Sequence, residues 1–251
     1  KKSLEPNLII FMSLIEILRV LYDNFLKYNP KKPKDKTRDR LILSKGHGCL
    51  ALYALLADKK FFAKKILRSA SKFNSILGGH PEYGKVPGVE ASTGALGHGP
   101  AIGVGMAISA KLNKLNYKTF VIVGDGEINE GSFWESSMIA SKHKLNNFHI
   151  IIDYNKIQSY GKTKEILDLE PLRFKLESFG YKVSEVNGHN VNHLKKYFTK
   201  IKKNRDKPIA LICHTIKGKG FPFAENNPYW HHKNSFTEKE VKEINKFLEK
   251  K

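Results

Sequence analysis

Two polar motifs each follow a run of hydrophobic residues, and together they could hold a metal ion and a phosphate group. Gly124–Gly126 reads Gly-Asp-Gly and comes directly after a hydrophobic run, while Asn155 follows the next such run along the chain. An Asp125 carboxylate, an Asn155 carbonyl and a main-chain carbonyl near Ile157 are three hard oxygen ligands. Mg²⁺ accepts such ligands when phosphate oxygens and water complete its shell. We therefore predict a metal–diphosphate site.

The backbone around the first motif also suits a phosphate. Gly124 and Gly126 allow a tight turn and a close approach to a ligand, and the following helix would present free N–H groups to the anion. Ligands of open parallel sheets bind beyond the carboxyl ends of the strands, where Asp125 and Asn155 are both expected.

The elements that position these residues alternate between strand and helix, which predicts an α/β fold with a parallel sheet covered by helices on both faces. We expect one domain, residues 1–251, with strands at 40–43, 119–123, 148–153, 181–186 and 208–216, and helices at 13–29, 49–57, 101–113, 131–143, 171–178, 191–203 and 238–249. Capping boxes, Ser13 with Glu16 and Thr237 with Glu240, would start the first and last helices. Residues 77–100 are rich in Gly, Pro and His and have no period, which favours a functional loop.

Composition limits the other classes of function. Lys and Arg number 44 against 24 Asp and Glu, a formal net charge of +20. Lys dominates and is scattered, whereas nucleic-acid readers cluster Arg, so we expect a solvated surface or a field for small anions and no nucleic-acid partner. No apolar run is long enough to cross a membrane. Two cysteines, Cys49 and Cys213, fit a reducing cytoplasm.

The motifs together resemble the diphosphate-binding half of transketolases, the thiamine diphosphate enzymes that move two-carbon units between sugars. The Gly-Asp-Gly to Asn pattern matches Gly124–Gly126 and Asn155. Matches specific to transketolases are Leu43–Gly48, Gly79–Glu82, Pro87–Gly94, Leu96–Gly99, Lys217–Gly220, Glu225–Pro228 and Trp230–His232. The fold implied is the thiamine diphosphate-binding (PP-type) fold.

The resemblance implies roles for individual residues. Asp125, Asn155 and the Ile157 carbonyl would bind Mg²⁺, or Ca²⁺ or Mn²⁺ in its place. Thiamine diphosphate would contact three groups of residues: His47, Gly124, Gly126, Glu127 and His231 or His232 near the diphosphate, Asn155 through the metal, and Gly94 and Leu96 along its rings. Of the histidine doublet we favour His231.

The resemblance also implies a catalytic group. His80 would contact the first hydroxyl of the donor sugar, with His47 and Glu130 as further catalytic residues. An imidazole with a pKa near neutrality can donate to hydroxyls and move protons. Glu130 and Glu135 match acidic positions at the family's subunit interface, where carboxylates share protons between sites.

Two departures from the transketolase pattern bear on partners and activity. The early family histidine is replaced by Pro6–Ile10, with Asn7 nearest its place. The family's second, pyrimidine-binding domain is not found within these 251 residues. In this respect the chain is similar to the amino-terminal subunit of a split transketolase. We expect a carboxy-terminal partner chain, a two-plus-two heterotetramer and phosphorylated sugar substrates.

Other functions remain open from sequence alone. A deoxyxylulose-phosphate synthase or 2-oxo-acid dehydrogenase subunit would share the Gly-Asp-Gly to Asn pattern, although Gly79–Glu82 argues against both. A non-catalytic transketolase-like subunit is supported only by Asn7. A basic nucleic-acid binder would show steeply salt-dependent binding.

Overall fold

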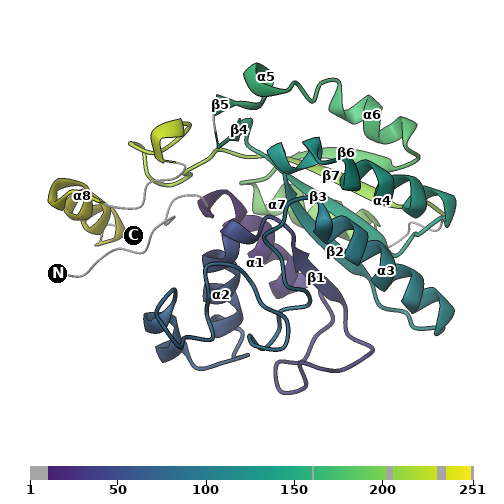
Figure 1. The fold of residues 1–251 in the computed structure, drawn as a ribbon, viewed down its shortest axis with the longest axis horizontal. Helices are drawn as coiled ribbons and strands as arrows, with labels where there is room; N and C mark the ends of the chain where they lie inside the picture. The colour runs from purple at the N-terminus through teal and green to yellow at the C-terminus, as the bar shows by residue number, and fades with distance from the viewer. Residues whose placement is uncertain (1–10, 160, 202–205, 231–235, 250–251) are drawn as a thin grey trace.

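A five-stranded parallel sheet forms the centre of the computed structural model, which describes residues 11–159, 161–201, 206–230 and 236–249 (Figure 1). The strand order is β1-β2-β3-β7-β6. The strands are β1 (Arg40–Leu43), β2 (Thr119–Gly124), β3 (Phe148–Tyr154), β6 (Lys182–Asn187) and β7 (Ile209–His214). A separate two-stranded antiparallel pair joins β4 (Ile157–Gln158) to β5 (Gly161–Lys162). The predicted parallel α/β sheet is confirmed.

Helices cover both faces of this sheet (Figure 1). The helices of the described residues are α1 (Ile15–Asn24), α2 (Cys49–Asp58), α3 (His98–Leu112), α4 (Gly131–Lys142), α5 (Thr163–Ile166), α6 (Leu172–Ser178), α7 (Val191–Ile201) and α8 (Glu238–Glu249). One core contains α1, α2 and α7, and the other contains α3, α4 and α6. A third, small cluster around Phe221 and Ile244 includes α8, which lies to one side of the sheet.

Strand periodicity explains how one sheet serves two cores. Along β2, Phe120 and Ile122 belong to the first core and Val121 and Val123 to the second. Successive side chains of a strand point to opposite faces, so a strand covered on both sides must be apolar at every position. That requirement is why the uninterrupted apolar runs predicted the strands.

Close packing of α3 on β2 depends on a glycine. A Cβ built on Gly103 would lie 2.5 Å from Cγ2 of Val121, whereas one built on Gly105, on the same helix, meets nothing within 4 Å. The small side chains of this helix therefore allow a close approach to the sheet at Gly103.

The predicted start of the first helix is wrong. A 3₁₀ turn, Met12–Leu14, precedes α1, and Leu14 occupies the N-cap position without a side-chain cap. Ser13 is fully buried and donates its hydroxyl hydrogen bond to Asp153 of β3 instead. The helix also ends at Asn24 rather than near residues 28–29.

The second predicted capping box is confirmed at α8. The amide of Thr237 donates to Oε2 of Glu240 at 2.8 Å, and the amide of Glu240 donates to Oγ1 of Thr237 at 3.3 Å. No tertiary acceptor competes for Thr237 among its described contacts, so the local pattern decides the structure there.

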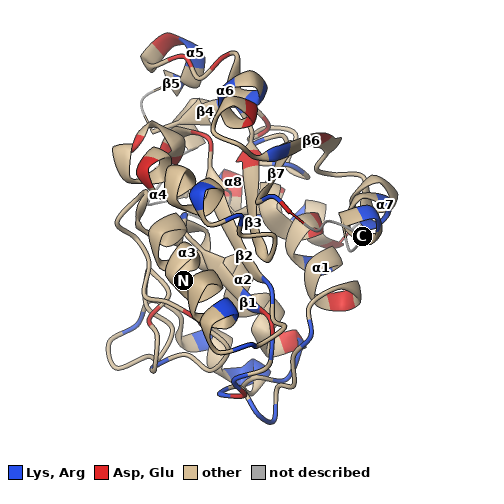
Figure 2. Ribbon diagram, turned by 90° about the vertical axis from the view of Figure 1, so that its right-hand side faces the viewer, with Lys and Arg blue, Asp and Glu red and all other residues tan. Residues whose placement is uncertain are grey.

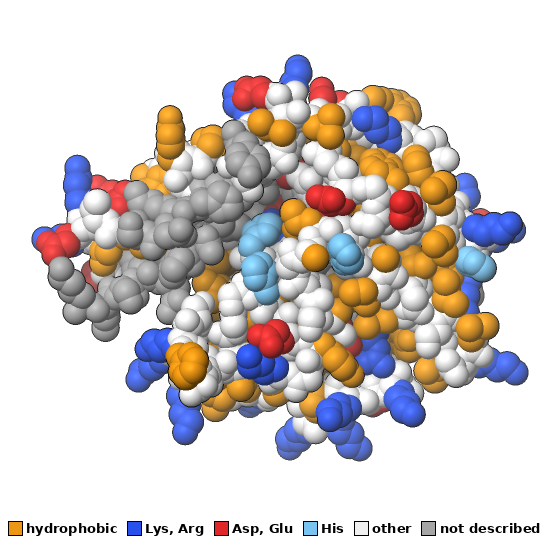
Figure 3. Space-filling model, in the orientation of Figure 1, with side chains coloured by type: hydrophobic (Ala, Val, Ile, Leu, Met, Phe, Trp, Pro, Cys, Tyr) orange, Lys and Arg blue, Asp and Glu red, His pale blue; other side chains and the backbone are white. Residues whose placement is uncertain are grey.

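Charged residues are dispersed over the ribbon rather than gathered on one element (Figure 2). On the face shown in Figure 3, lysines and arginines protrude mostly towards the outline, while histidines lie near the middle and at the right-hand edge. This dispersal agrees with a solvated basic surface. Within the described ranges, no helix is both long and apolar enough to pass through a bilayer.

Candidate functional site

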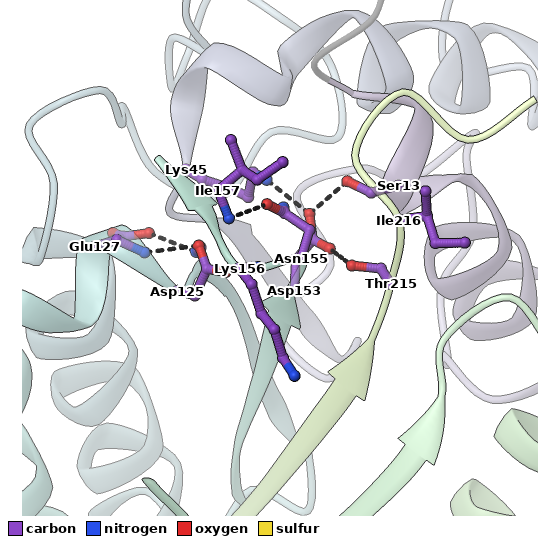
Figure 4. A network of polar contacts seen from close by, with 12 residues as sticks. Ser13, Lys45, Asp125, Glu127, Asp153, Asn155, Lys156, Ile157, Thr215 and Ile216 are labelled. Carbon is purple, nitrogen blue, oxygen red and sulfur yellow. Dashed lines mark hydrogen bonds and ion pairs between the residues drawn. The ribbon is translucent and has the colours of Figure 1, made fainter. Parts of the chain in front are cut away.

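The two predicted metal-binding side chains lie at neighbouring strand ends (Figure 4). Gly124 of β2 pairs with Asp153 of β3, so both strands stop at the same level. The backbone amide of Lys156, the residue after Asn155, donates a hydrogen bond to Oδ2 of Asp125. The prediction that Asp125 and Asn155 come together is therefore confirmed geometrically, while their role as ligands stays a prediction.

Local hydrogen bonds orient the oxygen atoms of this pair. Oδ1 of Asp125 accepts from the amide of Gly126 at 2.8 Å, and Oδ1 of Asn155 accepts from the amide of Ile157 at 3.1 Å. Both side chains are buried. A carboxylate has about four lone-pair sites and an amide oxygen has two, so each group keeps acceptor capacity for a cation.

Burial raises the pKa of Asp125 to about 6, and the negative charge of Asp153 adds to this effect. Lys45 and the amides of Gly126 and Lys156 oppose it. A divalent cation would reverse the balance because it favours the ionised carboxyl. In the part of the chain that the structure describes, no three His, Cys, Asp or Glu side chains form a metal-binding group, so a cation here would need oxygens from a phosphate.

Asp153 connects three segments behind this pair. Its Oδ2 accepts from Nζ of Lys45 at 2.7 Å and from Oγ of Ser13 at 2.6 Å, and its Oδ1 accepts from Oγ1 of Thr215. Burial alone would raise the pKa of Asp153, but Lys45 and these hydrogen bonds together lower it. The side chain has no exposed surface and both of its oxygens already accept from protein donors, so we assign it an organising role in the site.

Two buried lysines give the site its positive charge. Lys45 is 2% exposed and Lys217 is 3% exposed, and both lie in loops that follow strands. Burial lowers the pKa of Lys217 to about 7, Lys45 lowers it further, and Asp125 and Asp153 oppose the shift. An anionic ligand would supply the counter-charge that Lys217 lacks.

Sequence reasoning included these lysines in matched motifs but gave them no role. The available signal was their place in glycine-containing loops directly after strands. Their burial depends on contacts between distant segments, which no local pattern reveals.

Glu127, a predicted cofactor contact, joins three loops. Its Oε1 accepts from Oγ of Ser44 and, at 2.9 Å, from the amide of Gly97, and its Oε2 accepts from the amide of Gly124 at 3.1 Å. Burial raises its pKa, and these donors oppose the change. Glu127 thus holds the loop that contains Gly94 and Leu96 against the Gly-Asp-Gly turn.

The predicted catalytic histidine His80 meets the same loops. A Cβ built on Gly46 would lie 2.8 Å from Cδ2 of His80, and one built on Gly94 would lie 2.9 Å from that atom. The carbonyl of His80 accepts from the hydroxyl of Tyr53 at 2.8 Å, while its side chain is exposed. Glycine at both positions lets the imidazole lie directly on two backbones.

A largely buried ion-pair cluster anchors the loop before α3 at Glu90. Glu90 pairs with Arg38 through one carboxylate oxygen and with Arg40, at 3.3 Å, through the other. Burial lowers the pKa of Arg38 to about 10, and the nearby charge of Arg40 acts in the same direction. The cluster ties this loop to the start of β1.

The other predicted residues are spread around this centre. His47, Gly94 and Leu96 are half-buried, and Glu130 and Glu135 are exposed on or beside α4. Asn7, His231 and His232 lie outside the described residues. The functional roles given to all of these remain predictions.

A cavity of ≈ 560 Å³ opens beside the strand ends of β3 and β7. Its lining includes Asn155, Ile157, Thr215 and Ile216 together with several lysines, Lys156 among them. Oxygen ligands, buried cations and adjoining space suit a metal-bound diphosphate, so the residues present fit such a group.

Comparison with known proteins identifies a single family. Residues 7–249 match the family model described as the transketolase thiamine diphosphate binding domain. A curated relative from Phocaeicola vulgatus, named as one subunit of an apulose-4-phosphate transketolase, is 43% identical over 221 residues, which cover 88% of this chain and 78% of the relative. A 6-deoxy-6-sulfo-D-fructose transketolase subunit of a Clostridium species is 39% identical over 214 residues, which cover 85% of this chain and 78% of the relative.

Solved structures show the same fold. Transketolase from Campylobacter jejuni superposes with a TM-score of 0.86 and 33% identity over 93% of this chain. Transketolase from Pichia stipitis, in complex with sedoheptulose 7-phosphate, superposes with a TM-score of 0.85 and is 28% identical in sequence. The chain spans 37% and 36% of the length of these two structures, which is about a third.

Proposed function

We propose that this chain, which belongs to the transketolase family, is the thiamine diphosphate-binding subunit of a two-chain transketolase. The match over residues 7–249 and the relatives at 43% and 39% identity establish the family and its thiamine diphosphate binding domain. The proposed reaction moves a two-carbon ketol unit from a ketose phosphate to an aldose acceptor.

One contact carries the proposal: the Lys156 amide bonded to Asp125. It places the Asp125 carboxylate beside the backbone that joins Asn155 to Ile157, the other two proposed ligands. With Mg²⁺ held there, Lys45 and Lys217 supply positive charge at the same strand ends. Two buried lysines and one divalent ion suit a cofactor that carries an anionic diphosphate better than a neutral one.

In this proposal the residues of the chain bind and orient the metal, the cofactor and the donor sugar. Thiamine diphosphate, when bound, supplies the electron sink for cleavage of a bond between two sugar carbons. Asp125, Asn155 and the Ile157 carbonyl hold the metal, and His47 and Gly126 contact the diphosphate. His80, exposed where two glycine loops meet, hydrogen-bonds the donor sugar and holds or releases a proton at its first hydroxyl.

A partner chain completes the proposed enzyme. Two relatives bear names that describe them as transketolase subunits, and this chain covers 78% of each. We propose that a pyrimidine-binding chain pairs with this one, that two copies of each form the assembly, and that it works in the cytoplasm on phosphorylated sugars. The exposed Glu130 and Glu135 would face that interface.

Reconstitution tests the proposal directly. The chain is mixed with the transketolase-like chain from the same genome, Mg²⁺ and thiamine diphosphate, and transfer from a panel of ketose phosphates to aldehydes is followed. We expect turnover that disappears with EDTA and with Asn155→Ala. Asn146→Ala is the matched control and should retain activity, because Asn146 lies in the turn before β3, at the opposite end of that strand from Asn155.

The alternatives predict different results from the same mixture. Turnover of pyruvate without turnover of sugars would indicate a deoxyxylulose-phosphate synthase or an oxo-acid dehydrogenase. An assembled complex that binds no cofactor in the presence of Mg²⁺ would indicate a non-catalytic subunit. Either result would overturn the transketolase assignment of this chain.

A further inference from the structure

The turn Asn187–Asn190 packs tightly against the loop that follows β7. The amide of Gly188 donates to the carbonyl of His214 at 2.8 Å, and a Cβ built on Gly188 would lie 2.4 Å from Cγ2 of Thr215. Only glycine lets the two backbones approach so closely. This turn therefore lies directly beside Thr215–Lys217, although the function described above uses none of its residues.

Within the turn, each polar residue has a separate partner. Oδ1 of Asn187 accepts from the amide of His189 at 2.9 Å, and Oδ1 of Asn190 accepts from the amide of His193 in the first turn of α7 at 3.0 Å. These bonds fix the backbone on both sides of His189. The imidazole contacts the loop that follows β7.

The side chain of His189 bridges two segments. Its Nε2 accepts a hydrogen bond from the backbone amide of Ile216 at 2.8 Å, and its Nδ1 lies 3.2 Å from Oε2 of Glu16 in α1. Because Nε2 is an acceptor, the proton of a neutral imidazole is on Nδ1, on the side of Glu16, although the two atoms do not have hydrogen-bond geometry. The side chain is 10% exposed, so water competes little for these atoms.

The Ile216 amide is the point at which this bridge reaches the site. Thr215, one residue earlier, donates to the buried Asp153, and Lys217, one residue later, is buried and interacts electrostatically with Asp125 and Asp153. Asp153 and His189 therefore hold consecutive residues of one loop. Nothing else among the described contacts binds the Ile216 amide, so its direction depends on His189.

We propose that His189 is a positioning residue for the diphosphate site, which fixes the loop of Lys217 by accepting the Ile216 amide while its Nδ1 faces Glu16. This inference rests on the proposed function, because Lys217 matters only if a phosphate binds there. His189 touches neither cofactor nor substrate. Its effect is to keep the Lys217 ammonium at the strand ends before the anion arrives.

Two amide substitutions separate the bridge from general packing. In His189→Gln the terminal oxygen lies about as far from the backbone as Nε2, so it can still accept the Ile216 amide. In His189→Asn the side chain ends at the level of Nδ1 and can reach only towards Glu16. Both variants are polar and smaller than histidine, so a purely structural role would affect them alike.

The first measurement needs no cofactor. Hydrogen–deuterium exchange of the segment Thr215–Lys219 is compared in the full-length chain. We expect wild type and His189→Gln to exchange slowly and His189→Asn to exchange about tenfold faster, while exchange in β2 stays the same in all three. Equal exchange in the two variants would overturn the inference.

The second measurement titrates thiamine diphosphate, at saturating Mg²⁺, into the chain assembled with its partner. We expect binding about tenfold weaker in His189→Asn, with His189→Gln within about threefold of wild type. Equal affinity in the two variants, with a wild type that binds, overturns this inference alone. A wild-type complex that binds no thiamine diphosphate refutes the proposed function, and the inference falls with it.

Discussion

The buried ion pair between Lys45 and Asp153 predicts a large and specific effect on stability. Lys45→Met removes the ammonium and leaves the carboxylate with only the Ser13 and Thr215 hydroxyls as donors. Side-chain exposures of 2% and 0% mean that water cannot replace the lost charge. Breaking one side of such a pair costs about 3–5 kcal/mol of unfolding free energy. For a chain of this length, that is a fall in melting temperature of about 6–20 °C.

A double-mutant cycle tests whether the two charges act as a unit. Lys45→Met with Asp153→Asn removes both charges and keeps a side-chain amide for the two hydroxyls. We expect the double variant within about 1 kcal/mol of wild type. Because each single variant should lose about 3–5 kcal/mol, the magnitude of the coupling energy should be at least about 5 kcal/mol. Urea unfolding of the metal-free chain, followed by circular dichroism, supplies the free energies.

An exposed pair provides the matched control. Lys64 lies 3.3 Å from Asp58 with side-chain exposures of 72% and 41%, so Lys64→Met should change the unfolding free energy by less than about 0.5 kcal/mol. The reasoning is refuted if Lys45→Met is as mild as this control. It is also refuted if the double variant loses the sum of both single losses.

The stabilisation should also depend on pH in a stated direction. The pKa of Asp153 is lowered from its ordinary value of 3.8 in the folded chain. Its contribution is therefore complete above that ordinary value and is lost as the pH falls towards the folded pKa. The stability difference between wild type and Asp153→Asn should shrink in acid, and a constant difference would contradict the pair's ionic character.

Three further predictions concern the metal, the loop anchor and the helix packing. The pKa of Asp125 is raised to about 6, so Mg²⁺ should bind about tenfold more tightly per pH unit as the pH rises towards 6, and then level off. Calorimetry with thiamine diphosphate at pH 5, 6 and 7 measures this, and a flat profile would show that Asp125 does not ligate. The same raised pKa means that the metal-free chain loses stability as the pH rises from about 4 to 6. Glu90→Gln leaves the buried Arg38 and the half-buried Arg40 without their counter-charge and should cost about 3 kcal/mol in urea unfolding, against less than about 0.5 kcal/mol for Glu82→Gln in an exposed pair. Similar losses would rule out the buried cluster as an anchor. Gly103→Ala should destabilise by about 1–3 kcal/mol through overpacking, whereas Gly105→Ala should be neutral or stabilise by up to about 1 kcal/mol, and thermal melts that rank them in reverse would refute the packing argument.

The sequence predicted the parts of the fold that burial alone determines. Strands β2, β3 and β7 lie between two helical layers, so their composition had to be apolar at every position, and the expected ranges agree with the observed ones to within two residues. The meeting of Asp125 with the residues around Asn155 followed from the same logic, because parallel strands end at one edge of a sheet.

Tertiary contacts decided the features that the sequence did not predict. Ser13 had the residue type and spacing of a helix cap, whose oxygen would accept from a backbone amide. Its hydroxyl instead donates to the buried carboxylate of Asp153, because a charge-assisted hydrogen bond is the stronger of the two. The two-residue strands β4 and β5 are too short to show a period. Lys45 and Lys217 are buried only because segments from the whole chain converge on them.

The span of the hydrogen bonds to Asp153 has a consequence for biosynthesis. Ser13 precedes it by 140 residues and Thr215 follows it by 62, so its carboxyl is fully coordinated only after β7 has emerged from the ribosome. Until then Asp153 has only Lys45 and Ser13, which precede it in the chain, as partners, and the last central strand must arrive before the end of β3 can close. Binding of thiamine diphosphate should therefore follow the last step of folding rather than assist the early steps. A ribosome-stalled chain that stops before β7 should bind no thiamine diphosphate.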